Sequence, residues 1–103
     1  MIVLASNNDV NKIIKGTQKT FIFLHTPMCG TCKLARKYLE VIEYMEDTPS
    51  LYDIDINVLG NSCIVEWGIQ SVPCLAIVKD GQLVNKMFAF ESVTKIYEFI
   101  RNN

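Results

Sequence analysis

Short apolar segments alternate with amphipathic segments along the chain, and turn-forming residues separate them. Two of the apolar segments, residues 20–25 and 74–78, are rich in β-forming residues and too short for helices, which is typical of strands buried on both faces. The Asp80–Gly81 pair favours a tight hairpin turn. The predicted strands are residues 2–4, 20–25, 51–56, 74–78 and 83–89.

Other segments have apolar residues at helical spacing. Ser6 and Ser92 stand where N-caps are expected, before a first helix that ends near Gly16 and before a final helix. A long helix is predicted from about residue 29 to about residue 46, with this apolar stripe: Leu34, Ala35, Tyr38, Leu39, Val41, Ile42 and Met45. Residues 57–67 predict an irregular segment or a short helix, with Ser62 as its N-cap and Gly68 as its end.

The predicted order of elements is (β)αβαβαββα. Strands that alternate with helices favour a mostly parallel sheet with helices on both faces, because the crossovers are right-handed. The final hairpin adds an antiparallel strand, so we expect an α/β fold with a central mixed sheet. A chain of 103 residues fits one domain, residues 1–103.

Composition and charge exclude several classes of function. Half of the residues are hydrophobic and the formal net charge is −1, so the chain has no basic stripe for nucleic acid and no polybasic patch for a membrane. The longest apolar run is far short of the roughly 20 residues that span a bilayer. The first residues have no basic region of the kind that begins a signal peptide. We therefore expect a cytoplasmic protein that binds neither nucleic acid nor membrane.

Cys29 and Cys32 form a C-x-x-C motif between a predicted strand and a predicted helix. At a helix N-terminus, and with Lys33 nearby, the pKa of the Cys29 thiol should fall below the free value of about 8.5. Cys32 lies one turn further into the helix, more sheltered and within disulfide reach of Cys29. These features favour a dithiol–disulfide exchange centre. Metal binding and inert core packing remain the alternatives at this point.

Three stretches of the sequence resemble the thioredoxin family: residues 21–33 (FIFLHTPMCGTCK), 67–73 (WGIQSVP) and 78–81 (VKDG). Their spacing and the order of elements cover nearly the whole chain. The resemblance implies the thioredoxin fold and a thiol–disulfide oxidoreductase that reduces or exchanges protein disulfides. It implies no cofactor and no metal, and as partners it implies protein substrates and a reductase or low-molecular-weight thiol that supplies electrons. We expect the protein to act as a monomer.

The resemblance also assigns roles to residues. Cys29 would be the attacking cysteine and Cys32 the resolving one, together forming the redox-active disulfide. Pro73 would be the family's cis-proline, so that the backbone of Val72 faces the dithiol and pairs with an extended substrate segment. The resemblance adds three residues to the substrate-binding set: Met28, Trp67 and Gly68. Ile69 would help to shape the same groove, whereas Trp67 at a helix end also fits core packing.

Several positions depart from the family pattern. Met28 and Thr31 stand where a tryptophan and a proline are usual, and His25 stands where many members have another tryptophan. Phe23 occupies the place of a buried aspartate, and Leu51 occupies that of the lysine beside it. Together these departures indicate a divergent thioredoxin-like protein with a C-G-T-C motif rather than a standard thioredoxin. We interpret His25 as a partly buried strand-end residue rather than a catalytic base.

Two further cysteines lie outside the motif. Cys63 is interpreted as a structural or semi-exposed thiol. Cys74 follows Pro73 directly, so we expect it near the dithiol, either as a small buried strand residue or as an accessory thiol that exchanges with Cys29. Two other functions remain open: a binding module that uses the groove around Pro73, and a chaperone for soft metals that uses Cys29 and Cys32.

Overall fold

A computed structural model describes residues 1–103 and contains one five-stranded sheet in the order β1-β3-β2-β4-β5. The strands are β1 (Ile2–Val3), β2 (Thr20–His25), β3 (Leu51–Asp55), β4 (Cys74–Lys79) and β5 (Gln82–Met87). The helices are α1 (Asn7–Ile14), α2 (Gly30–Glu43), α3 (Ile56–Leu59), α4 (Asn61–Glu66) and α5 (Val93–Arg101). No helix is long and apolar enough to cross a membrane.

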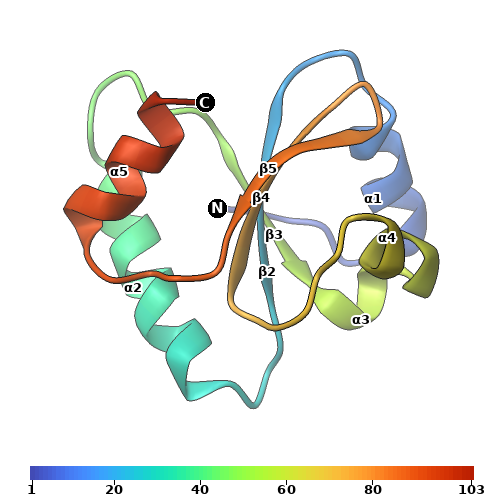
Figure 1. Ribbon diagram of the computed structural model, residues 1–103, viewed down its shortest axis with the longest axis horizontal. Coiled ribbons are helices and arrows are strands. Elements are labelled where there is room, and N and C mark those ends of the chain that lie inside the picture. The colour runs from blue at the N-terminus through green and yellow to red at the C-terminus, as the bar shows by residue number, and fades with distance from the viewer.

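The sheet forms the middle layer, with α2 and α5 on one face and α1, α3 and α4 on the other (Figure 1). Each face has its own core. The α2-side core consists of Phe21, Phe23, Cys32, Ala35, Leu39, Ile42, Leu51, Leu75, Ile77, Ile96 and Ile100. The α1-side core consists of Leu4, Val10, Ile14, Ile22, Leu24, Ile54, Leu59, Trp67, Ile69, Cys74, Ala76 and Val78. β2 and β4 supply alternate residues to both cores, which explains why their sequences are continuously apolar.

The expectation of a mostly parallel sheet is wrong on one side of β2. β1, β3 and β2 are parallel, but β4 is antiparallel to β2, and β5 is antiparallel to β4. Helices α3 and α4 have four and six residues and so are about 6 and 9 Å long, shorter than a strand of about 20 Å. The connection between β3 and β4 is therefore too short to cross the sheet. β4 begins at the same end of the sheet at which β3 ends, and it runs in the opposite direction.

Several predicted local signals are confirmed. The Ser6 and Ser92 hydroxyls accept hydrogen bonds from backbone amides in the first turns of α1 and α5. The hairpin turn uses Asp80 and Gly81, both with positive φ. Ser62, in contrast, is not an N-cap, because the segment splits into two short helices that begin after Asp55 and Gly60.

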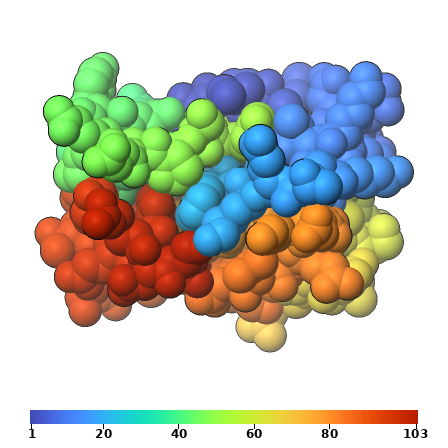
Figure 2. Space-filling view, turned by 90° about the horizontal axis from the view of Figure 1, so that it is seen from above, coloured from blue at the N-terminus to red at the C-terminus, as the bar shows by residue number.

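Helix α2 ends at Glu43, three residues earlier than predicted, and its buried stripe is narrower. Its buried residues are Cys32, Ala35, Leu39 and Ile42. Leu34 and Val41 are half exposed, since residues one position away from the stripe point about 100° away from it. Figure 2 shows α5 in red beside the green segment that follows α2. Helices α2 and α5 also contact each other and cover the same face of the sheet (Figure 1).

We expect Leu39→Ala to lower the free energy of unfolding by about 2–5 kcal/mol, because it removes a fully buried side chain from the α2-side core. Val41→Ala on the same helix should change it by less than about 0.5 kcal/mol. Urea unfolding followed by circular dichroism measures both. Equal losses in the two variants would contradict the assignment of the buried stripe.

Candidate active site

The two cysteines of the motif lie where strand β2 passes into helix α2. Cys29 is the N-cap residue of α2, and Cys32 is 3% exposed in the first turn. Their Cα atoms are 5.1 Å apart, and the two residues form a disulfide bond. The predicted position of the pair, between a buried strand and a long helix, is confirmed.

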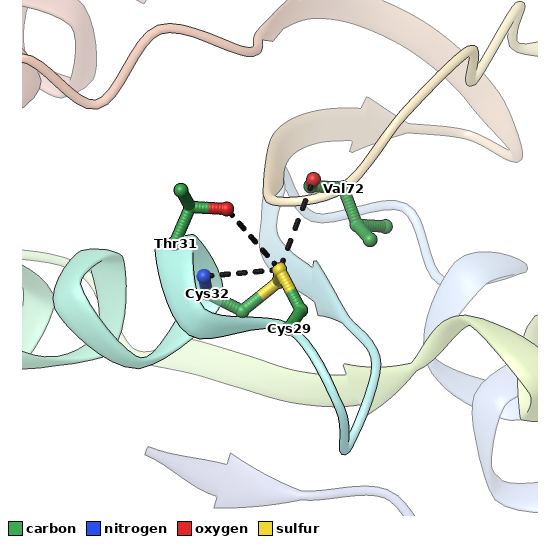
Figure 3. The surroundings of a disulfide bond; sticks show 4 residues. All are labelled: Cys29, Thr31, Cys32 and Val72. Atoms are coloured by element: carbon green, nitrogen blue, oxygen red, sulfur yellow. Dashed lines mark hydrogen bonds between the residues drawn. A yellow bond between two sulfur atoms is a disulfide. The ribbon is translucent and has the colours of Figure 1, made fainter.

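Polar groups surround the sulfur of Cys29 (Figure 3). The backbone amide of Cys32 donates a hydrogen bond to Cys29 Sγ at 3.1 Å, and Thr31 Oγ1 lies 3.2 Å from the same atom. Thr31, one of the departures from the family pattern, thus brings a hydroxyl donor to the sulfur. An amide, a hydroxyl and the positive end of the helix dipole all favour negative charge on Sγ when the disulfide is reduced.

The loop before β4 faces this sulfur. The carbonyl oxygen of Val72 lies 4.0 Å from Cys29 Sγ, and the Val72–Pro73 peptide bond is cis. Pro73 is buried, whereas Met28 is 95% exposed. The structure therefore brings the Val72 carbonyl to the Cys29 sulfur, and the residue just before Cys29 is the exposed, apolar Met28.

Trp67 does not belong to that surface. Its side chain is 2% exposed and packs in the α1-side core. The interpretation of Trp67 as a packing residue at a helix end is therefore confirmed, and its assignment to substrate binding is wrong. Gly68 ends α4 with φ +63°, a conformation that favours glycine. The amides of Gly68 and Ile69 bond back to Val65 and Ile64, which completes the closing turn of the helix.

The structure separates Cys74 from the dithiol. Its thiol has no exposed surface and lies in the α1-side core, whereas Cys32 belongs to the α2-side core. Burial raises the pKa of Cys74 to about 11, so this thiol stays protonated at neutral pH. An accessory exchange role is therefore not supported. Cys63 is also a free thiol, and burial raises its pKa.

Three charged or titratable side chains meet around Phe23. Asp53 is the direct partner of Phe23 across the β2–β3 pair, and its two carboxylate oxygens contact His25 Nε2 and Arg36 Nη1. The Phe23 ring stacks on His25 with centroids 5.3 Å apart, and the Arg36 guanidinium lies 5.3 Å from the ring centroid. We call Phe23, His25, Arg36 and Asp53 the Asp53 cluster.

Asp53 stays ionised despite its burial. Burial acts to raise the pKa of Asp53, but the hydrogen bond from Arg36 and the electrostatic interactions with His25 and Arg36 outweigh it, so the pKa lies below the ordinary value. The hydrogen bond to Asp53 raises the pKa of Arg36 in turn. Asp53 is thus the register partner of Phe23, and Leu51 lies two residues before Asp53 on the same face of the sheet, in the α2-side core with Phe23.

Sequence reasoning did not find Asp53 or Arg36. The available signals were weak: a polar residue in an alternating strand, and a base one helical turn after Cys32. Neither signal identifies a partner, because the pairing depends on strand register. No group of three or more His, Cys, Asp or Glu side chains is arranged to hold a metal ion.

The fold and this pair of cysteines define a thioredoxin-fold protein with a disulfide-capable dithiol. The family model described as Thioredoxin matches residues 1–102. The chain belongs to the thioredoxin family, as the resemblance of its motifs implied, and this membership supports thiol–disulfide oxidoreductase activity in general.

Individual relatives agree with this assignment. The chain is 38% identical to the thioredoxin-like protein YusE of Bacillus subtilis over 80 residues, which are 78% of this chain and 74% of YusE. It is 27% identical to the thioredoxin of the same organism over 78 residues, covering 75% and 74% of the two chains. A Malassezia sympodialis thioredoxin structure superposes with a TM-score of 0.81 at 21% identity, covering 99% of this chain and 89% of the other. At that identity the likeness shows the fold alone.

The Asp53 cluster predicts a specific acid dependence of stability. Because the pKa of folded Asp53 lies below its unfolded value of 3.8, its contribution is present above that value and is lost as the pH falls through the folded pKa. Asp53→Asn should cost about 1–3 kcal/mol at pH 7 and flatten the loss of stability below pH 4. Denaturant unfolding at pH values from 2 to 7 measures this.

The matched control is Asp55→Asn on the same strand. Asp55 caps α3, and asparagine caps a helix equally well, so the change at pH 7 should stay within about 0.5 kcal/mol. An acid limb for Asp53→Asn as steep as that of the wild type would show that Asp53 is not held ionised.

Proposed function

We propose that this protein is a thiol–disulfide oxidoreductase in which Cys29 attacks protein disulfides and Cys32 completes the exchange. The observation that carries the proposal is the Cys29–Cys32 disulfide at the N-terminus of α2, with the Val72 carbonyl 4.0 Å from Cys29 Sγ. Family membership supports the same class of reaction. Protein substrates are favoured because exposed Met28 and the Val72 backbone offer apolar and hydrogen-bonding contacts to an extended segment.

The exchange proceeds in two steps in the reduced protein. The Cys29 thiolate attacks one sulfur of the substrate disulfide, which forms a mixed disulfide and releases the other sulfur as a thiolate. Cys32 then loses its proton and attacks Cys29 Sγ, which releases the second substrate thiolate and forms the Cys29–Cys32 disulfide. The substrate gains two electrons, and a reductase or low-molecular-weight thiol restores the dithiol.

The nearest donors favour Cys29 as the attacking sulfur. The Cys32 amide and the Thr31 hydroxyl contact Cys29 Sγ, whereas Cys32 is buried in the apolar α2-side core. An apolar environment disfavours a thiolate. In the reduced protein at neutral pH, iodoacetamide should therefore alkylate Cys29 before Cys32.

Turnover of a protein disulfide with dithiothreitol as the reductant tests the assignment. We expect Cys29→Ser to reduce the rate to that of dithiothreitol alone, because the attacking sulfur is gone. Cys32→Ser, reduced and freed of dithiothreitol before it meets the substrate, should instead trap a stoichiometric mixed disulfide. Cys63→Ser is the matched control and should retain wild-type turnover, since Cys63 is a free thiol outside the pair. Alkylation of Cys32 first, or equal activity of Cys29→Ser and wild type, would contradict the roles.

Because Phe23 stands where the family has a carboxylate, we expect the attack of Cys32 on the mixed disulfide to be slow. In the family pattern a buried carboxylate behind the resolving cysteine accepts its proton, but Phe23 packs with Cys32 in the α2-side core and accepts none. Asp53, the nearest carboxylate across the strand pair, is held ionised with both oxygens occupied by His25 and Arg36. A held anion of low pKa is a weak proton acceptor.

We therefore expect the mixed disulfide to accumulate in the wild type and to decay faster in Phe23→Asp/Asp53→Asn. Asp53→Asn removes the carboxylate that would otherwise face the new one. Stopped-flow mixing with a model disulfide, followed by acid quenching and mass spectrometry, measures both steps. Phe23→Leu/Asp53→Asn is the control, which opens the packing without adding an acid. Equal acceleration in the control, or no accumulation in the wild type, would show that the missing acid does not limit the second step.

A further inference from the structure

Lys86 on β5 binds the backbone just before the loop that faces the dithiol. Its Nζ atom donates hydrogen bonds to the carbonyl oxygens of Trp67 at 2.8 Å and Gly68 at 3.0 Å. These carbonyls lie at the end of α4, where no helical partner is available. A cation at this end also interacts favourably with the helix dipole. Lys86 therefore satisfies two carbonyls that the helix itself leaves unpaired.

The surroundings of Lys86 are shaped to hold the ammonium group. A Cβ atom at position 68 would lie 2.7 Å from Lys86 Nζ, so the group fits because residue 68 is glycine. The ammonium group also lies 5.9 Å from the ring centroid of Phe88, and its charge acts on the pKa of Cys74, lowering it against the effect of burial. Lys86 is half-buried, which strengthens its charge-assisted hydrogen bonds relative to those at an exposed site.

The segment that Lys86 holds is short and is fixed at its other end. From Gly68 the chain reaches Val72, whose carbonyl oxygen faces Cys29 Sγ, in four residues. Beyond Pro73 the chain enters β4, whose pairing with β2 begins at Cys74. Between these two fixed ends, residues 69–73 have little freedom, so the conformation of the loop depends on the contacts at Gly68.

We propose that Lys86 is a positioning residue that holds residues 68–73 in the conformation facing the dithiol and thereby sets the affinity for an extended substrate segment. The predicted effect of Lys86 on turnover rests on the proposed oxidoreductase function. The predicted effect of Lys86 on the conformation of the loop does not depend on that function. Lys86 touches neither the substrate nor the reacting sulfurs. Its action runs through the two carbonyls and the backbone that follows them.

The test compares a peptide disulfide of about ten residues with 5,5′-dithiobis(2-nitrobenzoic acid), a small disulfide that needs no extended groove. In Lys86→Met we expect KM for the peptide to rise about tenfold with kcat within twofold, the pattern of lost binding that is common to ground and transition state. The rate constant with the small disulfide should stay within twofold of the wild type. Lys79→Met, which removes an exposed lysine of the same hairpin, should leave all values unchanged.

Two further measurements separate positioning from a general loss of structure. Lys86→Arg keeps a cation able to donate to both carbonyls and should keep the peptide KM within threefold of the wild type. Amide hydrogen exchange followed by mass spectrometry should be faster at Gly68 and Ile69, whose amides bond back to Val65 and Ile64, in Lys86→Met, with exchange in β2 unchanged. An unchanged peptide KM, equal losses with both disulfides, or unchanged exchange at Gly68 and Ile69 would overturn the proposal. A wild type that turns over neither disulfide would instead refute the oxidoreductase function, and hydrogen exchange would still decide the role of Lys86.

Discussion

The antiparallel pairing of β2 with β4 is the constraint on which the site depends. Leu24, near the end of β2, pairs with Cys74 at the start of β4. The residues that follow β2 and the residues that precede β4 must therefore emerge at the same end of the sheet. The first group contains the C-x-x-C motif and the second contains Val72 and Pro73, so one strand pairing brings together groups more than forty positions apart. Burial of both strands on both faces fixes their register, since a slip of one residue would exchange the two cores.

The charged residues of the Asp53 cluster stabilise the region around Phe23 through ion pairing. A carboxylate buried beside Phe23 is stable here only because Arg36 and His25 satisfy it, and together they hold its pKa low. The same contacts join β2, β3 and α2 beneath the dithiol, which ties the helix that carries the cysteines to the sheet. Where the family pattern has an acid that takes up a proton, this chain has the ring of Phe23. The neighbouring carboxylate of Asp53 is ionised and is held by His25 and Arg36. The ring at this position offers no proton acceptor, while the fold stays the same.

The helix that carries the dithiol and the loop that faces it are held in place by different kinds of contact. Helix α2 carries Cys32 in its first turn and has Cys29 as its N-cap residue, with the helix dipole directed at the sulfur of Cys29. The opposing loop has no regular structure and depends on side chains and on glycine for its shape. Lys86 and Gly68 act there as a matched pair, because the ammonium group occupies the space that any other residue at position 68 would fill. A regular element can be recognised from its pattern, whereas such a contact cannot.

The sequence by itself determined the elements and the chemistry of the motif. Local signals such as the Ser6 and Ser92 caps, the Asp80–Gly81 turn and the strand–motif–helix order depend on neighbours within a few residues, so the sequence contains them in full. The tertiary structure alone decided strand direction, the face on which Cys74 lies, the burial of Trp67, and the partners of Asp53 and Lys86. These features depend on register and on contacts between residues distant in the chain. No local pattern encodes such contacts, because their energy arises only when the sheet has brought the groups together.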